Sequence, residues 1–262
     1  MENETEKLIK KLAIQAGEIT AKKFGKVGVK YTKRDIGDVV TEADLIANRM
    51  IISGIKEKYP DHNIISEEIP SEKTKSKYLW TVDPLDGTRN FVTTTPLFCT
   101  MICFVKNSEP QLAVIYDPIC KNLYFAKKGR GAFLNGKKMK CSDTKKWEQS
   151  FGCGPCNMNT KKGVNKVMRR LIVAAEKETF WLSALGSTGI SMMAVASGRR
   201  DWGFSLSGEI WDYAPVFLIL KEAGCTITAL DGKPWKLGTE GMITGNKYLQ
   251  PKLLTLIKDA LK

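Results

Sequence analysis

Two aspartates, Asp83 and Asp86, flank Pro84 directly after an apolar run at residues 79–82. The run is typical of a buried strand, and we expect the proline to end the hydrogen-bond ladder of that strand. A tight turn there would bring both carboxylates to one point, where they repel each other unless a cation lies between them. Because hard oxygen ligands favour Mg²⁺, the segment predicts a magnesium site.

Gly87 and Thr88 follow this acidic pair. Gly87 has no side chain, so a ligand can approach its backbone closely, and N–H groups that open a helical turn can bind phosphate. One short segment would then hold a metal and a phosphate together. An Asp-Pro turn with Asp86 as a helix cap explains the same residues, and the segment alone leaves both interpretations open.

Three further acids stand where elements are expected to begin or end. Glu67 and Glu68 follow a predicted strand, so at least one of them would reach the same sheet edge, unless the two form a solvated loop pair. Asp212 stands at the start of a predicted helix, where a simple N-cap is the alternative. Each acid alone therefore has a structural explanation.

The chain has a single histidine, His62, which limits the chemistry that it can perform. Zinc sites built from three histidines and the HExxH protease motif are excluded by count. Acid and base catalysis must then come from carboxylates, hydroxyls, lysines or metal-bound water. The seven cysteines are odd in number and thinly spread, which predicts reduced thiols rather than a disulfide scaffold.

The chain of 262 residues carries 41 Lys plus Arg against 28 Asp plus Glu, a formal charge of +13. Basic residues gather over residues 127–146, where Asp143 is the only acid, and they would attract anionic substrates or form a solvated face. The sequence has no RNP-like segment, helix-turn-helix pattern, signal peptide or long uncharged apolar run. We therefore expect a soluble, cytoplasmic protein without a nucleic-acid or membrane partner.

Hydrophobic periodicity predicts a layered α/β fold. Helices are predicted at residues 4–24, 41–59, 164–176, 187–197, 211–223 and 251–261. Strands are predicted at residues 63–66, 78–83, 98–105, 111–116 and 123–126, and near Phe180, Trp202 and Thr226. We expect one compact catalytic unit with two lobes: an α+β lobe at 1–145 that carries most metal ligands, and an α/β lobe at 146–262 that carries Asp212 and the substrate-side contacts.

Five motifs, in this order, resemble those of the inositol monophosphatase family. They are residues 37–44, Ser66-Glu67-Glu68, residues 82–91, Gly186-Ser187-Thr188, and residues 211–214 with 222–224. The resemblance implies a five-layered αβαβα sandwich of the inositol monophosphatase and fructose-1,6-bisphosphatase type. It also implies a homodimeric phosphoric monoester hydrolase that uses two or three Mg²⁺ ions and water to hydrolyse a small phosphate monoester.

The resemblance further implies which residues hold the metal ions. Glu67, Asp83 and the Leu85 carbonyl would hold one ion. Asp83, Asp86 and Asp212 would hold a second, and Glu67 would assist at a third.

Catalytic and substrate-binding roles are implied in the same way. Asp44 and Thr88 would orient and deprotonate the attacking water, with Glu67 as a further catalytic residue. Gly87 and Thr88 would bind phosphate, and Lys33 and Asp38 would belong to a mobile loop. The implied substrate contacts are Asp86, Gly186, Ser187, Thr188, Ser205 and Asp212.

The substrate is less constrained than the chemistry. Inositol phosphatases carry an acid that contacts inositol hydroxyls where an ungapped match places Ser205 in this chain. Inositol 1-phosphate or a related sugar or polyol phosphate is the first expectation. The alternatives are 3'-phosphoadenosine 5'-phosphate, fructose 1,6-bisphosphate, histidinol phosphate and NADP. Pro215 departs from the family motif, and we expect it in a first helical turn, where its missing N–H costs no hydrogen bond.

Cys153 and Cys156 form a Cys-Gly-Pro-Cys motif, which is typical of thiol-disulfide oxidoreductases. A redox-active motif needs a helix N-terminus to lower the pKa of its first thiol, but the residues after Cys156 are poor helix formers. We therefore expect a loop, and a regulatory disulfide between the two cysteines stays an alternative hypothesis. Structural zinc is disfavoured because no second close cysteine pair accompanies the motif.

Overall fold

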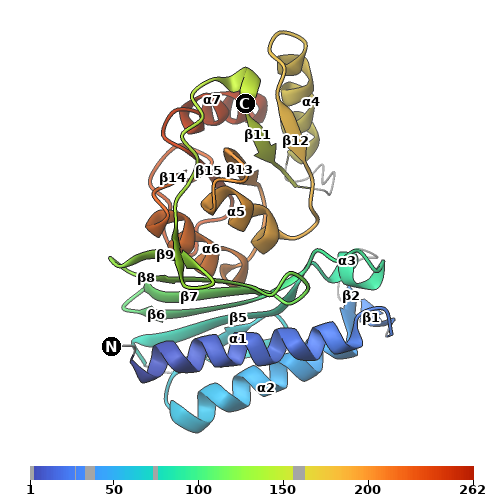
Figure 1. Cartoon of the computed structure of the whole chain (residues 1–262), viewed down its shortest axis with the longest axis vertical. Coiled ribbons are helices and arrows are strands. Elements are labelled where there is room, and N and C mark those ends of the chain that lie inside the picture. Colours follow the sequence, from blue (N-terminus) through green and yellow to red (C-terminus); the bar gives the residue numbers. More distant parts are fainter. Residues whose placement is uncertain (1–2, 27, 33–38, 73–75, 156–162) are drawn as a thin grey trace.

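The computed structural model of the chain describes residues 3–26, 28–32, 39–72, 76–155 and 163–262. Its elements stack in five layers, which Figure 1 shows from bottom to top. The layers are α1 (Glu4–Lys23) with α2 (Glu42–Lys58), an eight-stranded sheet, α5 (Thr188–Ala196) with α6 (Ile210–Glu222), a five-stranded sheet, and α4 (Val164–Ala175) with α7 (Gln250–Leu261). The expected αβαβα fold is confirmed. Lys33, Asp38 and Cys156 lie outside the described residues.

The eight-stranded sheet carries most of the expected site. Its order is β10 (Lys137–Met139), β9 (Gly131–Leu134), β8 (Asn122–Lys127), β7 (Glu109–Asp117), β6 (Cys99–Lys106), β5 (Tyr78–Asp86), β3 (Asn63–Ser66) and β4 (Ile69–Glu72). β3 and β5 are parallel, with Ser66 opposite Val82, and the other neighbours are antiparallel. The carboxyl ends of β3 and β5 therefore meet at one edge, which brings Glu67 towards Asp83.

The five-stranded sheet follows in the chain after η1 (Trp147–Gln149). Its order is β12 (Trp181–Ser183), β11 (Phe151–Cys153), β13 (Trp202–Ser205), β15 (Met242–Gly245) and β14 (Thr226–Thr228). A separate antiparallel pair, β1 (Val29–Thr32) and β2 (Val39–Thr41), precedes α2. The chain passes from the first sheet to the second between Met139 and Phe151, and the two-lobe division at residue 145 stays a prediction.

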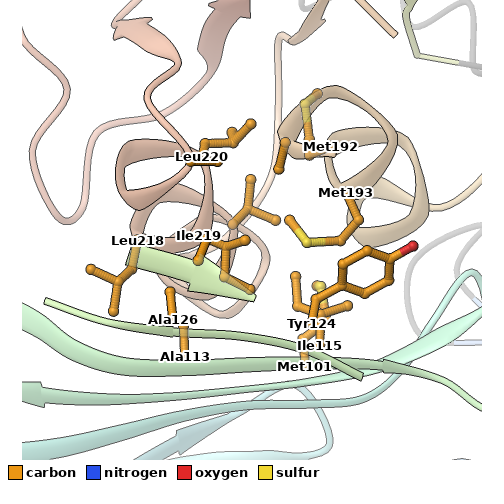
Figure 2. Close-up of a cluster of buried hydrophobic side chains, with 14 of the residues drawn as sticks. Met101, Ala113, Ile115, Tyr124, Ala126, Met192, Met193, Leu218, Ile219 and Leu220 are labelled. Atoms are coloured by element: carbon orange, nitrogen blue, oxygen red, sulfur yellow. The ribbon is translucent and has the colours of Figure 1, made fainter. Parts of the chain in front are cut away.

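Helices α5 and α6 are buried between the two sheets. Figure 2 shows Met193 of α5 and Ile219 of α6 above Met101 and Ile115 of the first sheet, and all four belong to one buried cluster. Truncating such a side chain to alanine typically costs about 2–5 kcal/mol. This core fixes both helices, and with them the residues at their N-terminal ends.

β5 does not end at Pro84, so the expectation that the proline stops the ladder is wrong. The strand continues to Asp86, with Asp83 opposite Met101, Asp86 opposite Cys99 and a bulge between the two pairs. A bulge accommodates a residue that has no N–H to donate to the ladder. The strand therefore passes the proline and carries both aspartates.

The expectation for Pro215 is also wrong. Helix α6 begins at Ile210 with Glu209 as its N-cap, which places Pro215 inside the helix. The N–H that Pro215 lacks would have paired with the Trp211 carbonyl. Pro215 is buried in the core, so packing holds the helix despite the lost hydrogen bond.

No helix among the described residues combines the length and the apolar character that a bilayer span requires.

Candidate metal and phosphate site

Asp83, Asp86 and Asp212 converge, although they come from β5 and from the first turn of α6. One carboxylate oxygen of each lies within 4.8 Å of the corresponding oxygens of the other two. Residues three apart in a regular strand point to opposite faces, and the bulge at Pro84 removes this separation. The structure thus brings together three of the residues that the sequence predicts as metal ligands.

Asp86 lies against the N-terminus of α5. Its Oδ2 accepts the Gly189 N–H at 2.7 Å and the Ser187 hydroxyl, while its Oδ1 accepts the Thr188 N–H at 3.1 Å. A helix N-terminus favours a negative charge. Ser187 and Thr188, predicted as substrate contacts, therefore position a carboxylate of the cluster, and both also line the neighbouring pocket.

Asp212 is held by the cap of its own helix. Its Oδ2 accepts the Glu209 N–H at 2.6 Å, within a capping box that starts α6. Gly208 packs so closely that an added Cβ would lie 2.9 Å from Asp212 Oδ2. The short connection before α6 therefore fixes where this carboxylate points.

Glu67 lies outside the close trio but borders the same pocket. Its N–H donates to the Val82 carbonyl at 3.2 Å, which continues the parallel pairing of β3 with β5. The Glu67 charge raises the pKa of both Asp83 and Asp212, so its carboxylate lies within electrostatic range of the trio.

Burial raises the pKa of every acid in the trio, and repulsion by neighbouring acids raises the pKa of Asp83 and Asp212 further. Burial raises the pKa of Asp83 well above its usual value, and Glu67, Asp86 and Asp212 raise it further. Burial, with Asp86 and Glu67, raises the pKa of Asp212 to about 8. Burial also raises the pKa of Asp86, against the hydrogen bonds from Ser187 and the α5 amides. Acids this close are all ionised together only when a cation neutralises them; otherwise they take up protons.

The donor atoms at this place fit Mg²⁺. They are the carboxylate oxygens of the trio, and such hard oxygen ligands are those that Mg²⁺ prefers. Leu85 is buried next to the bulge, and its N–H donates to Asp83 Oδ1 at 3.0 Å. The turn at Leu85 therefore orients both its own carbonyl and the Asp83 carboxylate.

Asp44 and Thr88 face each other beside the cluster. Thr41 caps α2 as expected, and its N–H donates to Asp44 Oδ2 at 2.8 Å, with a further bond from its hydroxyl. The other oxygen, Oδ1, lies 3.4 Å from the Thr88 hydroxyl, which also lies 3.0 Å from the Leu85 carbonyl. Burial raises the pKa of Asp44 to about 6, which suits a group that takes up a proton near neutral pH.

A pocket of 310 Å³ opens next to these residues. Gly87 and Thr88 line it and begin the short helix α3 (Thr88–Val92). Gly87 has φ 93°, and an added Cβ would lie 2.9 Å from the Leu97 carbonyl oxygen, so only glycine fits. The volume suits a small molecule.

Asn90 and Arg89 are site residues that the sequence analysis missed. The Asn90 side-chain amide donates to the Leu97 and Leu185 carbonyls, both at 2.7 Å, and so joins α3 to the turn before α5. An added Cβ at Gly186 would lie 2.6 Å from Asn90 Oδ1, which explains the glycine there. Arg89 is the one cationic side chain among the described residues that line the pocket. Their position in the motif at residues 82–91 is the sequence feature that could have identified both as site residues.

Ser205 borders the pocket from the end of β13. Its hydroxyl lies 3.0 Å from the Ser207 carbonyl and 3.0 Å from the Tyr213 hydroxyl. These protein contacts fix its position, and a contact with substrate stays a prediction.

Cys153 lacks the environment of a redox-active thiol. It is fully buried at the end of β11, and burial raises the pKa of its thiol to about 11. Reactive thiols instead have lowered pKa values. A disulfide with Cys156 stays a hypothesis because Cys156 lies outside the described residues.

Comparison with known proteins gives one consistent result. The profile of the inositol monophosphatase family matches residues 1–262. A fructose-1,6-bisphosphatase/inositol-1-monophosphatase of Thermotoga maritima is 31% identical over 252 residues, which cover 96% of this chain and 95% of the relative.

Solved structures agree with this match. An IMPase of Thermotoga maritima superposes with a TM-score of 0.87 and 29% identity over 96% of each chain. An IMPase/NADP phosphatase complexed with Mg²⁺ and phosphate superposes with a TM-score of 0.80 and 26% identity, over 92% of this chain and 90% of that chain. The match over the whole chain shows that this protein belongs to the inositol monophosphatase family.

Proposed function

We propose that this protein is a Mg²⁺-dependent phosphatase that hydrolyses a small phosphate monoester with a metal-activated water. The observation that carries the proposal is the convergence of Asp83, Asp86 and Asp212 next to the start of α3. Membership of the inositol monophosphatase family supports the same activity. A related structure is complexed with both Mg²⁺ and phosphate.

Each acid in the cluster has a place in the proposed metal site. Glu67, Asp83 and the Leu85 carbonyl would hold one ion, Asp83, Asp86 and Asp212 would hold a second, and Glu67 would assist at a third. Mg²⁺ supplies positive charge that neutralises the phosphate dianion, and it lowers the pKa of a bound water. Asp86 and Asp212 are held in place by α5 and α6, so their carboxylates need little rearrangement when the ions bind.

Asp44 and Thr88 handle the proton in this proposal. The Thr88 hydroxyl has one proton and two acceptors within reach, Asp44 Oδ1 and the Leu85 carbonyl. When its proton is directed to Asp44, the Thr88 oxygen can accept a hydrogen bond from the attacking water. Asp44, whose pKa is raised to about 6, then takes up the proton that the water loses.

Gly87 and Thr88 bind the phosphate through their backbone N–H groups at the start of α3. Such donors stabilise the charge on the oxygens of the transferring phosphoryl group. The groups that would bind the phosphate therefore lie beside the Asp44–Thr88 pair.

The proposed substrate is inositol 1-phosphate or a related sugar or polyol phosphate. Gly186, Ser187, Thr188 and Ser205 border the pocket and present mostly small polar groups to it. Fructose 1,6-bisphosphate and NADP are the strongest alternatives, because the names of two relatives include these activities. Arg89 in the pocket wall favours a substrate with a second anionic group.

We further propose a homodimer in the cytoplasm. Trp181 and Phe151 are 64% and 44% exposed, and their rings stack with centroids 6.1 Å apart at the edge of the five-stranded sheet. Exposed aromatic side chains at a sheet edge favour association. The described cysteines are free thiols, as a reducing compartment requires. Light scattering of wild type and Trp181→Lys tests the dimer, which the variant should dissociate.

A substrate panel tests the proposed activity. Phosphate release is measured from inositol 1-phosphate, fructose 1,6-bisphosphate, 3'-phosphoadenosine 5'-phosphate, histidinol phosphate and NADP, with Mg²⁺ or EDTA. We expect Mg²⁺-dependent release that Asp83→Asn abolishes and that the matched control Asp259→Asn, an exposed acid on α7, leaves unchanged. Release that persists in EDTA, or in Asp83→Asn, contradicts the proposal.

A further inference from the structure

Two cysteines far apart in the sequence meet on the side of the molecule where α6 ends. Cys141 follows β10, and Cys225 lies between α6 and β14. The two thiols are close enough to share a hydrogen bond. The Cys141 N–H donates to the Ala223 carbonyl at 3.0 Å, and the Cys141 thiol donates to the Gly224 carbonyl oxygen at 3.4 Å.

The backbone holds both cysteines in this arrangement. The Cys225 N–H donates to the Leu220 carbonyl at 3.0 Å, which ties it to the last turn of α6. On the other side, the Asn246 side-chain amide donates to the Ser142 hydroxyl and to the Thr144 carbonyl, both at 2.9 Å. These bonds hold the segments that carry the two cysteines next to each other.

A basic surface pocket gives access to Cys141. The pocket has a volume of 610 Å³, and the residues that line it include Cys141 and three lysines, Lys137, Lys138 and Lys140, against one acid, Asp143. The hydrogen bond from Cys225 and the charge of Lys140 lower the pKa of the Cys141 thiol to about 7, against the effects of burial and Asp143. A thiolate beside lysines is nucleophilic and attracts anionic reagents.

We propose that Cys141 is a site of thiol-disulfide exchange with small anionic disulfides, and that Cys225 completes the reaction as the resolving thiol. This modification goes beyond the proposed phosphatase activity. It involves neither the Cys-Gly-Pro-Cys motif nor any residue of the metal site.

The exchange proceeds in two steps. The Cys141 thiolate attacks one sulfur of the small disulfide, whose S–S bond breaks and releases one thiolate. Cys225 then loses its proton to solvent and attacks the Cys141 sulfur, which releases the second thiolate and leaves a Cys141–Cys225 disulfide. The protein loses two electrons and, because Cys141 reacts as a thiolate, one proton. The small disulfide gains the two electrons and leaves as two thiolates, which take up protons from solvent according to their own pKa.

Cys225 becomes a better nucleophile once the first step has occurred. The Cys141 thiolate and its hydrogen bond, together with burial, hold the pKa of the Cys225 thiol well above its usual value. In the mixed disulfide, Cys141 carries no charge and no longer accepts that hydrogen bond. The first step therefore removes two causes of the raised pKa of the Cys225 thiol, which prepares Cys225 for its attack in the second step.

Incubation of the full-length, Mg²⁺-loaded protein with oxidised glutathione tests this inference, followed by alkylation of the remaining thiols and peptide mass spectrometry. We expect the wild type to give a linked Cys141–Cys225 peptide that dithiothreitol releases. Cys225→Ser should accumulate a glutathione adduct at Cys141, and Cys141→Ser should form neither product. Phosphate release by both variants serves as the check that they fold.

Cys120 provides the matched control thiol. Cys120 is an exposed residue. Partial burial of its sulfur atom and the nearby Asp117 nevertheless raise the pKa of its thiol. We therefore expect Cys141 to react roughly tenfold faster than Cys120. The proposal is overturned if Cys120 reacts as fast as Cys141, if Cys225→Ser carries no adduct at Cys141, or if the wild type retains both thiols.

Discussion

The Gly189 N–H donates to the Asp86 carboxylate at 2.7 Å, so the first turn of α5 binds the same side chain that belongs to the acidic cluster. An added Cβ at Gly189 would lie 3.0 Å from Asp86 Oδ2 and 2.4 Å from Cys99 Sγ. The position of α5 and the geometry of the proposed metal site are therefore linked through one carboxylate.

Gly189→Ala should weaken Mg²⁺ binding. Replacing glycine by alanine inside a helix normally stabilises the helix. A loss of Mg²⁺ affinity in this variant would therefore report the clash of the new methyl group with Asp86 and Cys99. We expect an increase of about tenfold or more in the Kd for Mg²⁺, measured by calorimetry, for a clash that costs about 1–3 kcal/mol. Gly54→Ala in α2 is the matched control, because the atoms nearest to its added methyl belong to the Leu12 side chain and to no acid of the cluster. Equal Mg²⁺ affinity in Gly189→Ala and wild type would contradict this link.

Thr88→Ala should lower kcat about 100-fold while Mg²⁺ binding persists, because it removes the hydroxyl that faces Asp44. Thr88→Ser keeps the hydroxyl and should retain most of the activity. Asp44→Asn should resemble Thr88→Ala, since the amide oxygen can still accept the Thr41 N–H but the side chain cannot take up a proton. Steady-state kinetics with a parallel Mg²⁺ titration separates these effects. Full activity in Thr88→Ala would exclude the proposed proton path.

Mg²⁺ should stabilise the folded protein, and more strongly at higher pH. The pKa of Asp212 is raised to about 8, so protons compete with Mg²⁺ for its carboxylate below that pH. For each proton that Mg²⁺ displaces, the apparent Mg²⁺ affinity changes by about tenfold per pH unit. At about 100-fold excess over Kd, binding adds about 2.7 kcal/mol, or roughly 5–10 °C in Tm. Thermal unfolding in Mg²⁺ or EDTA between pH 6 and pH 8 measures this. Asp212→Asn should lose most of the Mg²⁺-dependent shift, and a shift that is independent of pH in the wild type would count against the buried acids as ligands.

The single histidine should destabilise the fold when it is protonated. His62 Nδ1 accepts the Trp80 indole N–H at 3.1 Å, and its ring stacks on Tyr59 and Tyr78. Burial lowers the pKa of His62, against the charge of Asp61. The unfolded chain therefore takes up the proton first, and the stability present above about pH 6.5 is lost as the pH falls through the lower folded value.

An NMR titration of the one imidazole measures this pKa directly. A midpoint at or above that of a model histidine peptide would show that the Trp80 contact does not favour the neutral ring. His62→Gln, which cannot be protonated, should lose less stability than wild type between pH 7 and pH 5.5.

The long elements of the fold could be predicted from the sequence, whereas several of the short ones were missed. Helices α1 and α2 have 20 and 17 residues, enough for apolar periodicity and a cap at Thr41 to define them. β9, β10 and β15 have only three or four residues each. They were missed because a segment this short does not show a recognisable hydrophobic period. Pro84 was misjudged for a different reason: a bulge, which depends on pairing with β6, lets the strand pass it.

The candidate site shows the same division. Asp83, Asp86 and Asp212 were predicted from their types and motifs, and the structure brings them together. The bond from Ser187 to Asp86 and the bonds from Asn90 to Leu97 and Leu185 were not predicted. Such contacts depend on how α3, α5 and β5 pack, which no local pattern in the sequence encodes.

Crystals grown with Mn²⁺ in place of Mg²⁺, together with phosphate, would test the central claim most directly through anomalous scattering. We predict at least one anomalous peak between the carboxylates of Asp83, Asp86 and Asp212, with phosphate bound beside Gly87 and Thr88. Absence of a metal peak at the three aspartates, or phosphate bound away from the start of α3, would contradict the account.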